Sequence, residues 1–147
     1  MVNCTNNDIV IGCKGLIPEK QTPGAAGYDI RYNGSAVVLK PREVQLLSTG
    51  IYLEIPYGYE GQIRSRSGLS YKKGLVVVNS PGTIDSDYRG EIKVILGNIS
   101  GGDRVVNPGD RIAQLVINRL PIVRFQSIDS LSDTTRGDGG FGSTGEK

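Results

Sequence analysis

The apolar residues of this chain fall into short segments rich in Val, Ile and Leu, and turn-forming residues separate these segments. No segment keeps a 3.6-residue period over helical length, whereas several alternate apolar and polar residues. Such segments are typical of strands, and their spacing predicts an all-β sandwich or barrel. The expected strands are residues 8–12, 28–30, 36–39, 43–49, 51–55, 59–64, 74–78, 91–96 and 110–117.

Length and glycine usage define the expected domain. The chain has 147 residues, enough for one domain with its own core. It contains 21 glycines, about twice the average usage, and many of them lie near the C-terminus. Residues 135–147 hold too few apolar groups to pack, so they predict a flexible Gly-rich arm. We therefore expect a single domain, 1–147, with a β core over 1–134 and an arm over 135–147.

The stretch from residue 79 to 91 lies between two expected strands, 74–78 and 91–96. It begins with Asn-Ser-Pro-Gly, which is turn chemistry. It then carries Asp85, Asp87 and Tyr88. The pattern predicts a β-hairpin with two acids and an aromatic ring near its return. Either this is an ordinary polar hairpin, or these groups form part of a site.

A second polar cluster lies in residues 64–70, which read Arg-Ser-Arg-Ser-Gly-Leu-Ser. Arginine offers a fork of donors to phosphate oxygens, and glycine lets backbone N–H groups approach an anion. The cluster is either a phosphate cradle or a solvated turn. Two polar residues inside expected strands leave similar alternatives. Asp29 is a surface acid or points inward, and Gln114 faces an edge or contacts a ligand.

Composition excludes several classes of chemistry. The chain has no histidine, which excludes a Ser-His-Asp triad, a Cys-His dyad and His-based zinc sites. A hydrolase of this composition must use a carboxylate to take a proton or to hold a metal. The net charge of +2 gives no argument for a nucleic-acid partner. No apolar run is long enough to cross a membrane and no signal peptide is visible, so we expect a cytoplasmic protein with free thiols.

Five motifs occur in this order along the chain, as residues 25–30, 65–69, 79–90, 109–115 and 136–145. Taken together they resemble the five motifs of the trimeric dUTP diphosphatase (dUTPase) family. The resemblance implies a β jelly roll, or distorted β-barrel, that forms a homotrimer with sites shared between subunits. It implies hydrolysis of dUTP to dUMP and pyrophosphate with Mg²⁺, which limits uracil incorporation into DNA and supplies dUMP for dTMP synthesis. It implies neither a nucleic-acid nor a membrane partner.

The resemblance also implies residue roles. Asp85 would be the general base for water attack on the α-phosphorus, and Asp29 would hold magnesium through water. Tyr88 would pack under the deoxyribose, and Phe141 would stack on the uracil. The base would be bound in the hairpin by Asn79, Gly82, Thr83, Ile84 and Lys93. The phosphates would be bound by Arg66, Ser67, Gly68, Gln114 and Arg136 and covered by Gly142, Ser143 and Thr144.

Other readings of the same scaffold remain open. A dCTP deaminase-like enzyme would need a proton-shuttling Glu near the Arg-Ser cluster, and residues 64–70 contain none. A non-catalytic nucleotide-binding regulator would be marked by loss of Asp85 or of the arm, and both are present. A structural jelly-roll trimer would explain the strands but not the composition of the arm. Release of pyrophosphate from dUTP distinguishes these readings.

Overall fold

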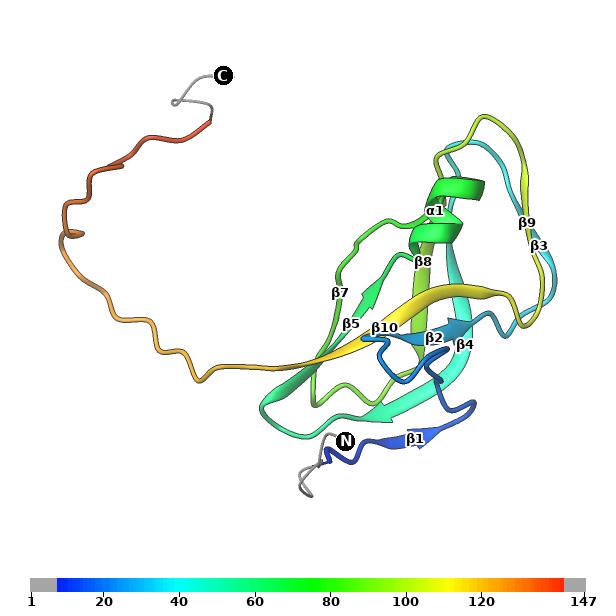
Figure 1. Ribbon diagram of the computed structural model, residues 1–147, viewed down its shortest axis with the longest axis horizontal. Coiled ribbons are helices and arrows are strands. Elements are labelled where there is room, and N and C mark those ends of the chain that lie inside the picture. Colours follow the sequence, from blue (N-terminus) through cyan, green and yellow to red (C-terminus); the bar gives the residue numbers. More distant parts are fainter. Residues whose placement is uncertain (1–7, 142–147) are drawn as a thin grey trace.

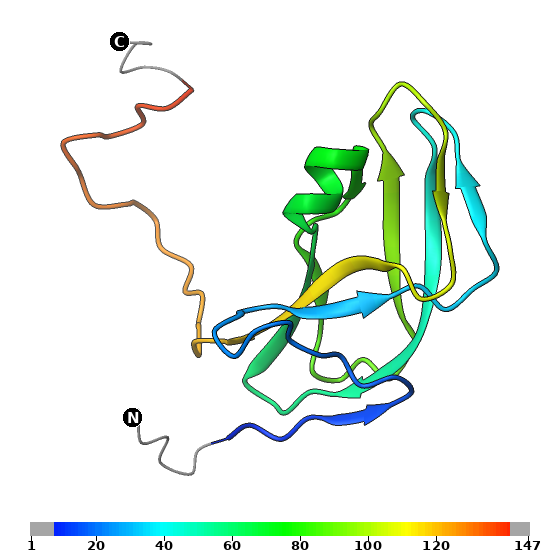
Figure 2. The ribbon, with the colours of Figure 1, turned by 45° about the vertical axis from the view of Figure 1, so that its right-hand side comes forward.

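The computed structural model describes residues 8–141, and every strand pair in that range is antiparallel. One four-stranded sheet has the order β1 (Gly12–Lys14), β4 (Val44–Glu54), β8 (Ile92–Asn98), β6 (Leu75–Val77). The other has the order β2 (Tyr28–Arg31), β10 (Arg111–Arg119), β5 (Tyr59–Arg64), β7 (Gly82–Ile84). A two-stranded ladder joins β3 (Val37–Leu39) to β9 (Arg104–Val106) at one end of the molecule (Figures 1 and 2). The expected all-β class is confirmed.

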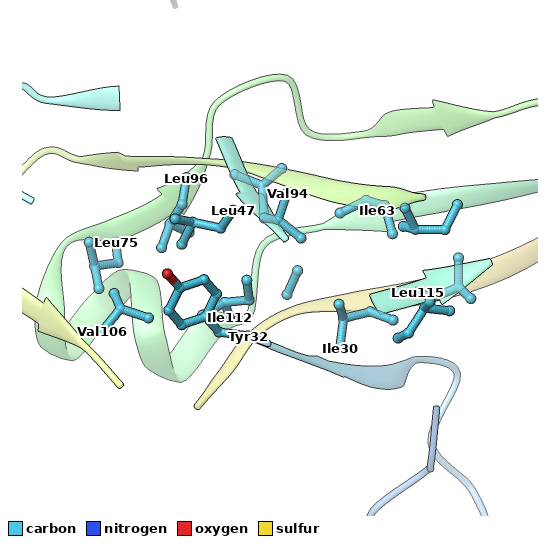
Figure 3. Close-up of a cluster of buried hydrophobic side chains, with 14 of the residues drawn as sticks. Ile30, Tyr32, Leu47, Ile63, Leu75, Val94, Leu96, Val106, Ile112 and Leu115 are labelled. Atoms are coloured by element: carbon cyan, nitrogen blue, oxygen red, sulfur yellow. The ribbon is translucent and has the colours of Figure 1, made fainter. Parts of the chain in front are cut away.

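The core lies between the two larger sheets. Alternate side chains of β4 are buried, as its alternating sequence predicts. They meet apolar residues of β2, β5, β8 and β10 in one cluster (Figure 3). Its fully buried members include Ile30, Leu96 and Ile112. Burial of these side chains is the main favourable term that holds the sheets together.

One prediction about the strands was wrong at Gly50. We expected two strands, 43–49 and 51–55, whereas β4 runs without a break from Val44 to Glu54. Its register against β8 shifts between Ser48 and Ile51, and Gly50 has a φ of 68°. The glycine therefore marks a β-bulge inside one strand instead of a turn between two.

The expected first strand, 8–12, was also misplaced. Strand β1 covers Gly12–Lys14 and pairs with the end of β4, where Cys13 lies opposite Leu53. Residues 8–11 belong to no strand, and Ile9 and Val10 are exposed. An apolar run without a ladder partner does not become a strand, because its backbone groups gain no inter-strand hydrogen bonds.

A short helix, α1 (Ser67–Lys73), occupies the polar cluster in which no helix was predicted. None of its residues is buried, so no apolar stripe with helical period exists to be read. Its end does carry a signal. Lys72 and Lys73 lie in the last turn, and Gly74 follows in the left-handed conformation with φ 64°. Both features are typical of a helix C-terminus.

The hairpin predicted around residues 79–91 exists at its base. Strands β6 and β8 pair antiparallel, with Val77 opposite Leu96. The connection between them, however, is not a simple return. Its residues 82–84 form β7, which pairs with β5 in the other sheet, and the Ser80–Pro81 peptide bond before it is cis. The connection therefore links the edges of the two sheets, and this crossing places the hairpin residues between them.

The chain leaves the body after β10. Residues 120–138 are exposed and contain no strand, and Figure 1 shows the C-terminal segment running away from the sheets. Large apolar side chains are exposed on this segment, at Ile122, Phe125 and Leu131 among others. The division of core and arm at residue 134 remains a prediction. No helix in the described part of the chain has the length and apolar character needed to cross a bilayer.

Candidate active site

Asp29 forms the centre of a cluster of charged groups. It lies on β2 opposite Gln114 of β10, and its side chain is only 11% exposed. Its Oδ1 is 3.0 Å from Nε of Arg66, and its Oδ2 accepts a hydrogen bond of 3.0 Å from Nη1 of Arg111. Asp29 is therefore an inward, doubly paired acid. Two guanidinium groups share one carboxylate, so the cluster keeps a net positive charge suited to an anion.

Gln114 positions the loop that leads into α1. Its Nε2 donates a 2.9 Å hydrogen bond to the carbonyl of Ser65, whose Oγ accepts one of 2.8 Å from the N–H of Val77. Gln114 therefore does not face an open edge of the sheet. Gly27 belongs to the motif that precedes β2. A glycine is needed there because a Cβ would overlap the Gln114 side chain. The small residues before Asp29 make room for the polar contact.

The start of α1 faces the same cluster. Arg66 is the N-cap residue, and no side chain caps the helix. Its Nη1 also donates to the carbonyl of Arg111 at 3.1 Å. Ser67 and Gly68 follow and are exposed, and a cleft of about 330 Å³ beside them is lined by Arg66, Gly68, Lys72 and Arg111 among others. The sequence prediction missed Arg111, which follows the turn residues of its motif directly.

The hairpin residues gather in a separate cleft of about 310 Å³ between β7 and β8. Seven residues that were predicted to contact the nucleoside, or to act on it, line this cleft: Asn79, Gly82, Thr83, Ile84, Asp85, Tyr88 and Lys93. Apolar side chains such as Ile92 form part of its wall. A small pocket with apolar walls and a few polar groups is the usual form of a ligand site. The structure therefore brings together the residues of one predicted subsite.

Tyr88 is held by its own turn. Its N–H donates to the carbonyl of Asp85 at 3.1 Å, and its hydroxyl donates to the carbonyl of Glu91 at 3.0 Å. The ring lies across Gly90, where a Cβ would overlap it. The glycine in the Tyr-Arg-Gly sequence thus allows the ring to fold back toward β8. Tyr88 is 45% exposed and forms one side of the cleft.

Glu91 lines the same cleft and was not predicted as a site residue. Its side chain is 19% exposed, and its Oε2 lies 3.7 Å from Nζ of Lys93. The backbone N–H of Gly50, which donates to the carboxylate, is the main cause that lowers the pKa of Glu91. The only sequence signal for Glu91 as a site residue is its position directly before an alternating strand.

Asp85 and Arg66 lie beyond opposite ends of one strand pair. In the β5–β7 ladder Gly61 lies opposite Ile84, so the chain continues to Asp85 at one end and reaches Arg66 at the other. The intervening stretch of about six residues spans roughly 20 Å. Asp85 of one chain is therefore far from Arg66 of the same chain, well beyond hydrogen-bond reach.

The arm residues do not join either cluster within the chain. Arg136 donates through Nε to the carbonyl of Gly139 at 2.8 Å, a contact within its own turn, and Phe141 is fully exposed. Gly142, Ser143 and Thr144 lie outside the described residues. Within 8–141 no group of three or more Asp, Glu, Cys or His side chains converges as a metal site. A divalent cation here would need oxygen ligands from elsewhere, such as phosphate groups.

Comparison with known proteins shows which family this chain is similar to. A family model described as dUTPase matches residues 14–145. The chain is 53% identical over 133 residues to the deoxyuridine 5'-triphosphate nucleotidohydrolase of Hydrogenobaculum sp., covering 89% of this chain and 91% of that protein. It is 51% identical over 132 residues to the protein of the same name from Chlamydia trachomatis, covering 88% and 91%.

The fold is also similar to solved structures. A dUTPase of Staphylococcus bacteriophage 80alpha with dUpNHpp superposes with a TM-score of 0.83 at 30% identity, covering 96% of this chain and 99% of that one. A mutant dUTPase from phage phi11 of S. aureus, whose structure concerns coordination of a structural Mg(II) ion, has a TM-score of 0.76 at 26% identity, covering 84% and 99%. The similarity confirms the expected jelly roll, although its sheets remain open instead of closing into a barrel.

Proposed function

The chain belongs to the dUTPase family, and we propose that it hydrolyses dUTP to dUMP and pyrophosphate. The observation that carries this proposal is the cleft between β7 and β8, which gathers Asn79, Asp85 and Tyr88 beside exposed backbone. Incubation with dUTP and Mg²⁺, followed by measurement of pyrophosphate, tests the proposal. Release of ammonia from dCTP instead would identify a deaminase.

Asp85 is the proposed general base. It directly follows β7, is exposed, and lines the cleft, so its carboxylate can hold a water molecule there. A chain without histidine has to use another proton acceptor, and a positioned carboxylate can take this role. Attack of that water on the α-phosphorus releases pyrophosphate as the leaving group. The rest of the site has to position the substrate and neutralise charge.

Arg66 and the first turn of α1 are proposed to bind the phosphate chain. The pairing of Arg66 with Asp29 fixes its guanidinium, and the exposed backbone of Ser67 and Gly68 offers further donors. Gln114 supports this arrangement through the carbonyl of Ser65. Arg136 and Phe141 of the arm, with Gly142, Ser143 and Thr144, would close over the phosphates and the base.

Mg²⁺ fits this site only in an indirect way. Both oxygens of Asp29 already pair with guanidinium groups, so direct coordination would break an ion pair, whereas a contact through water keeps it. The ion would be held chiefly by the phosphate oxygens, with Asp29 as the protein residue behind its water shell. When bound, it supplies neutralisation of phosphate charge.

Two features of the chain support the proposal of a homotrimer with shared sites. Asp85 lies about 20 Å along the strand from Arg66, which favours a site whose parts come from different chains. The segment after β10 exposes apolar side chains that a neighbouring subunit could bury: Ile122, Val123, Phe125, Ile128 and Leu131. We propose that the hairpin cleft of one chain meets the arginine cluster of the next and the arm of another.

A further inference from the structure

The bulge in β4 leaves two backbone donors without a strand partner. At Thr49 and Gly50 the register against β8 shifts, so their N–H groups do not enter the regular ladder. A single carboxylate oxygen accepts hydrogen bonds from both N–H groups. Oε1 of Glu91 accepts a hydrogen bond of 3.1 Å from Thr49 and one of 2.9 Å from Gly50. Glu91 thus closes the bulge with charge-assisted hydrogen bonds, which are stronger than neutral ones.

The same residue fixes the end of the site loop. Glu91 directly precedes β8, and its carbonyl accepts the hydrogen bond from the hydroxyl of Tyr88. Beside it, the hydroxyl of Thr49 donates to the carbonyl of Ile92. The side chain of Glu91 therefore accepts hydrogen bonds from β4, while its backbone carbonyl accepts one from the hydroxyl of Tyr88. The two contacts connect the buried part of the sheet to one wall of the nucleoside cleft.

We infer that Glu91 is a positioning residue that sets the preference of this enzyme for deoxyribose by fixing the ring of Tyr88. The inference rests on the proposed function. Tyr88 is 45% exposed and its hydroxyl makes one hydrogen bond, so few other groups determine the place of the ring. A ring held against the sugar leaves no room for a 2′-hydroxyl. If the Glu91 backbone shifts, the ring shifts with it and a ribonucleotide gains access.

The test compares kcat/KM for dUTP with kcat/KM for UTP. Glu91→Ala removes both bonds to the bulge, and we expect the dUTP-to-UTP ratio to fall about tenfold, the scale of one hydrogen bond to a charged group. Glu91→Gln keeps an oxygen acceptor and should stay within about threefold of wild type. Partial unfolding does not move this ratio, because both substrates report the same active molecules.

Glu43→Ala is the matched control. Glu43 also accepts a backbone hydrogen bond, 2.7 Å from the N–H of Lys40, but it precedes β4 at the end of the β4–β8 ladder away from the cleft. Its loss should lower the melting temperature and leave the substrate ratio unchanged. A Tyr88→Ala variant gives a second check. Adding Glu91→Ala to it should not lower the ratio further, because Glu91 acts through the ring.

Each outcome has one meaning. If the wild type releases no pyrophosphate from dUTP, the proposed function itself is wrong. If the wild type prefers dUTP and Glu91→Ala keeps the wild-type ratio, the positioning role is wrong. If Glu91→Ala does not fold, Glu91→Asp replaces it, because its carboxylate is one methylene too short to reach both N–H groups. Equal ratios for the Asp and Gln variants would then overturn the inference.

Discussion

Asp85 lines the hairpin cleft just beyond the end of β7, and its carboxylate is exposed to any water bound there. Asp85→Asn keeps the shape of this group but cannot accept the proton. We expect dUTP binding within a few-fold of wild type and a loss of about 10²-fold or more in kcat, the usual scale for removal of a general base. Steady-state kinetics and equilibrium binding measure the two effects. Near-normal turnover would show that another group takes the proton.

Glu91 makes stability depend on pH. The hydrogen bond from the N–H of Gly50 lowers the pKa of Glu91 in the folded chain, so the unfolded chain binds the proton more readily. This contribution is present above the unfolded-state pKa and is lost as pH falls through the folded-state pKa. We expect wild type to melt above Glu91→Gln near neutral pH, and the difference to vanish in acid below the usual glutamate range.

The comparison of wild type with Glu91→Gln isolates the effect of Glu91. Both proteins keep Glu43, the other carboxylate whose pKa a backbone hydrogen bond lowers. The backbone N–H of Lys40 similarly lowers the pKa of Glu43, which adds the same acid sensitivity to each. Thermal melts of the two proteins across a pH series give the difference directly. A difference in melting temperature that stayed constant into acid would mean that the charge of Glu91 contributes nothing to the fold.

At the scale of elements, the C-terminal segment separates from the sheets. The strands end at Arg119, and residues 120–138 form no strand and are exposed. Removal of residues 136–147 should therefore leave the melting temperature unchanged and abolish most turnover. Phe141→Ala alone should weaken the binding of dUTP by roughly 1–3 kcal/mol, because the stacking on the base is lost. A large fall in the melting temperature of the truncated protein would assign the arm a structural role instead.

At the scale of the whole molecule, the separation of Asp85 from Arg66 predicts sites shared between chains. Trimers of Asp85→Asn chains, and trimers of chains that lack the arm, should both be inactive. Co-refolding the two in equal amounts should restore activity in about one site in four by random assortment in a cyclic trimer. Mass spectrometry identifies the mixed trimers. Mixed trimers without activity would place the base and the arm of each site in the same chain.

Local sequence patterns determined much of this protein. Alternating apolar residues identified most strands, and turn residues located the hairpin that carries Asp85 and Tyr88. These features depend on neighbours in the chain, so a single sequence contains them. The five motifs also marked the family, because each combines residues whose spacing a turn or strand end requires. The absence of histidine is a property of composition, and it alone excluded a histidine general base.

Other features depended on contacts between distant residues and were visible only in the tertiary structure. Gly50 proved to be a bulge because the ladder of β8 continues past it, and Glu91 gained its role from the two N–H groups that this bulge frees. The pairing of Arg111 with Asp29 joins residues 82 positions apart. Helix α1 buries no residue, so no periodic pattern could reveal it. Strand register and side-chain pairing are long-range, whereas sequence patterns report only local preference.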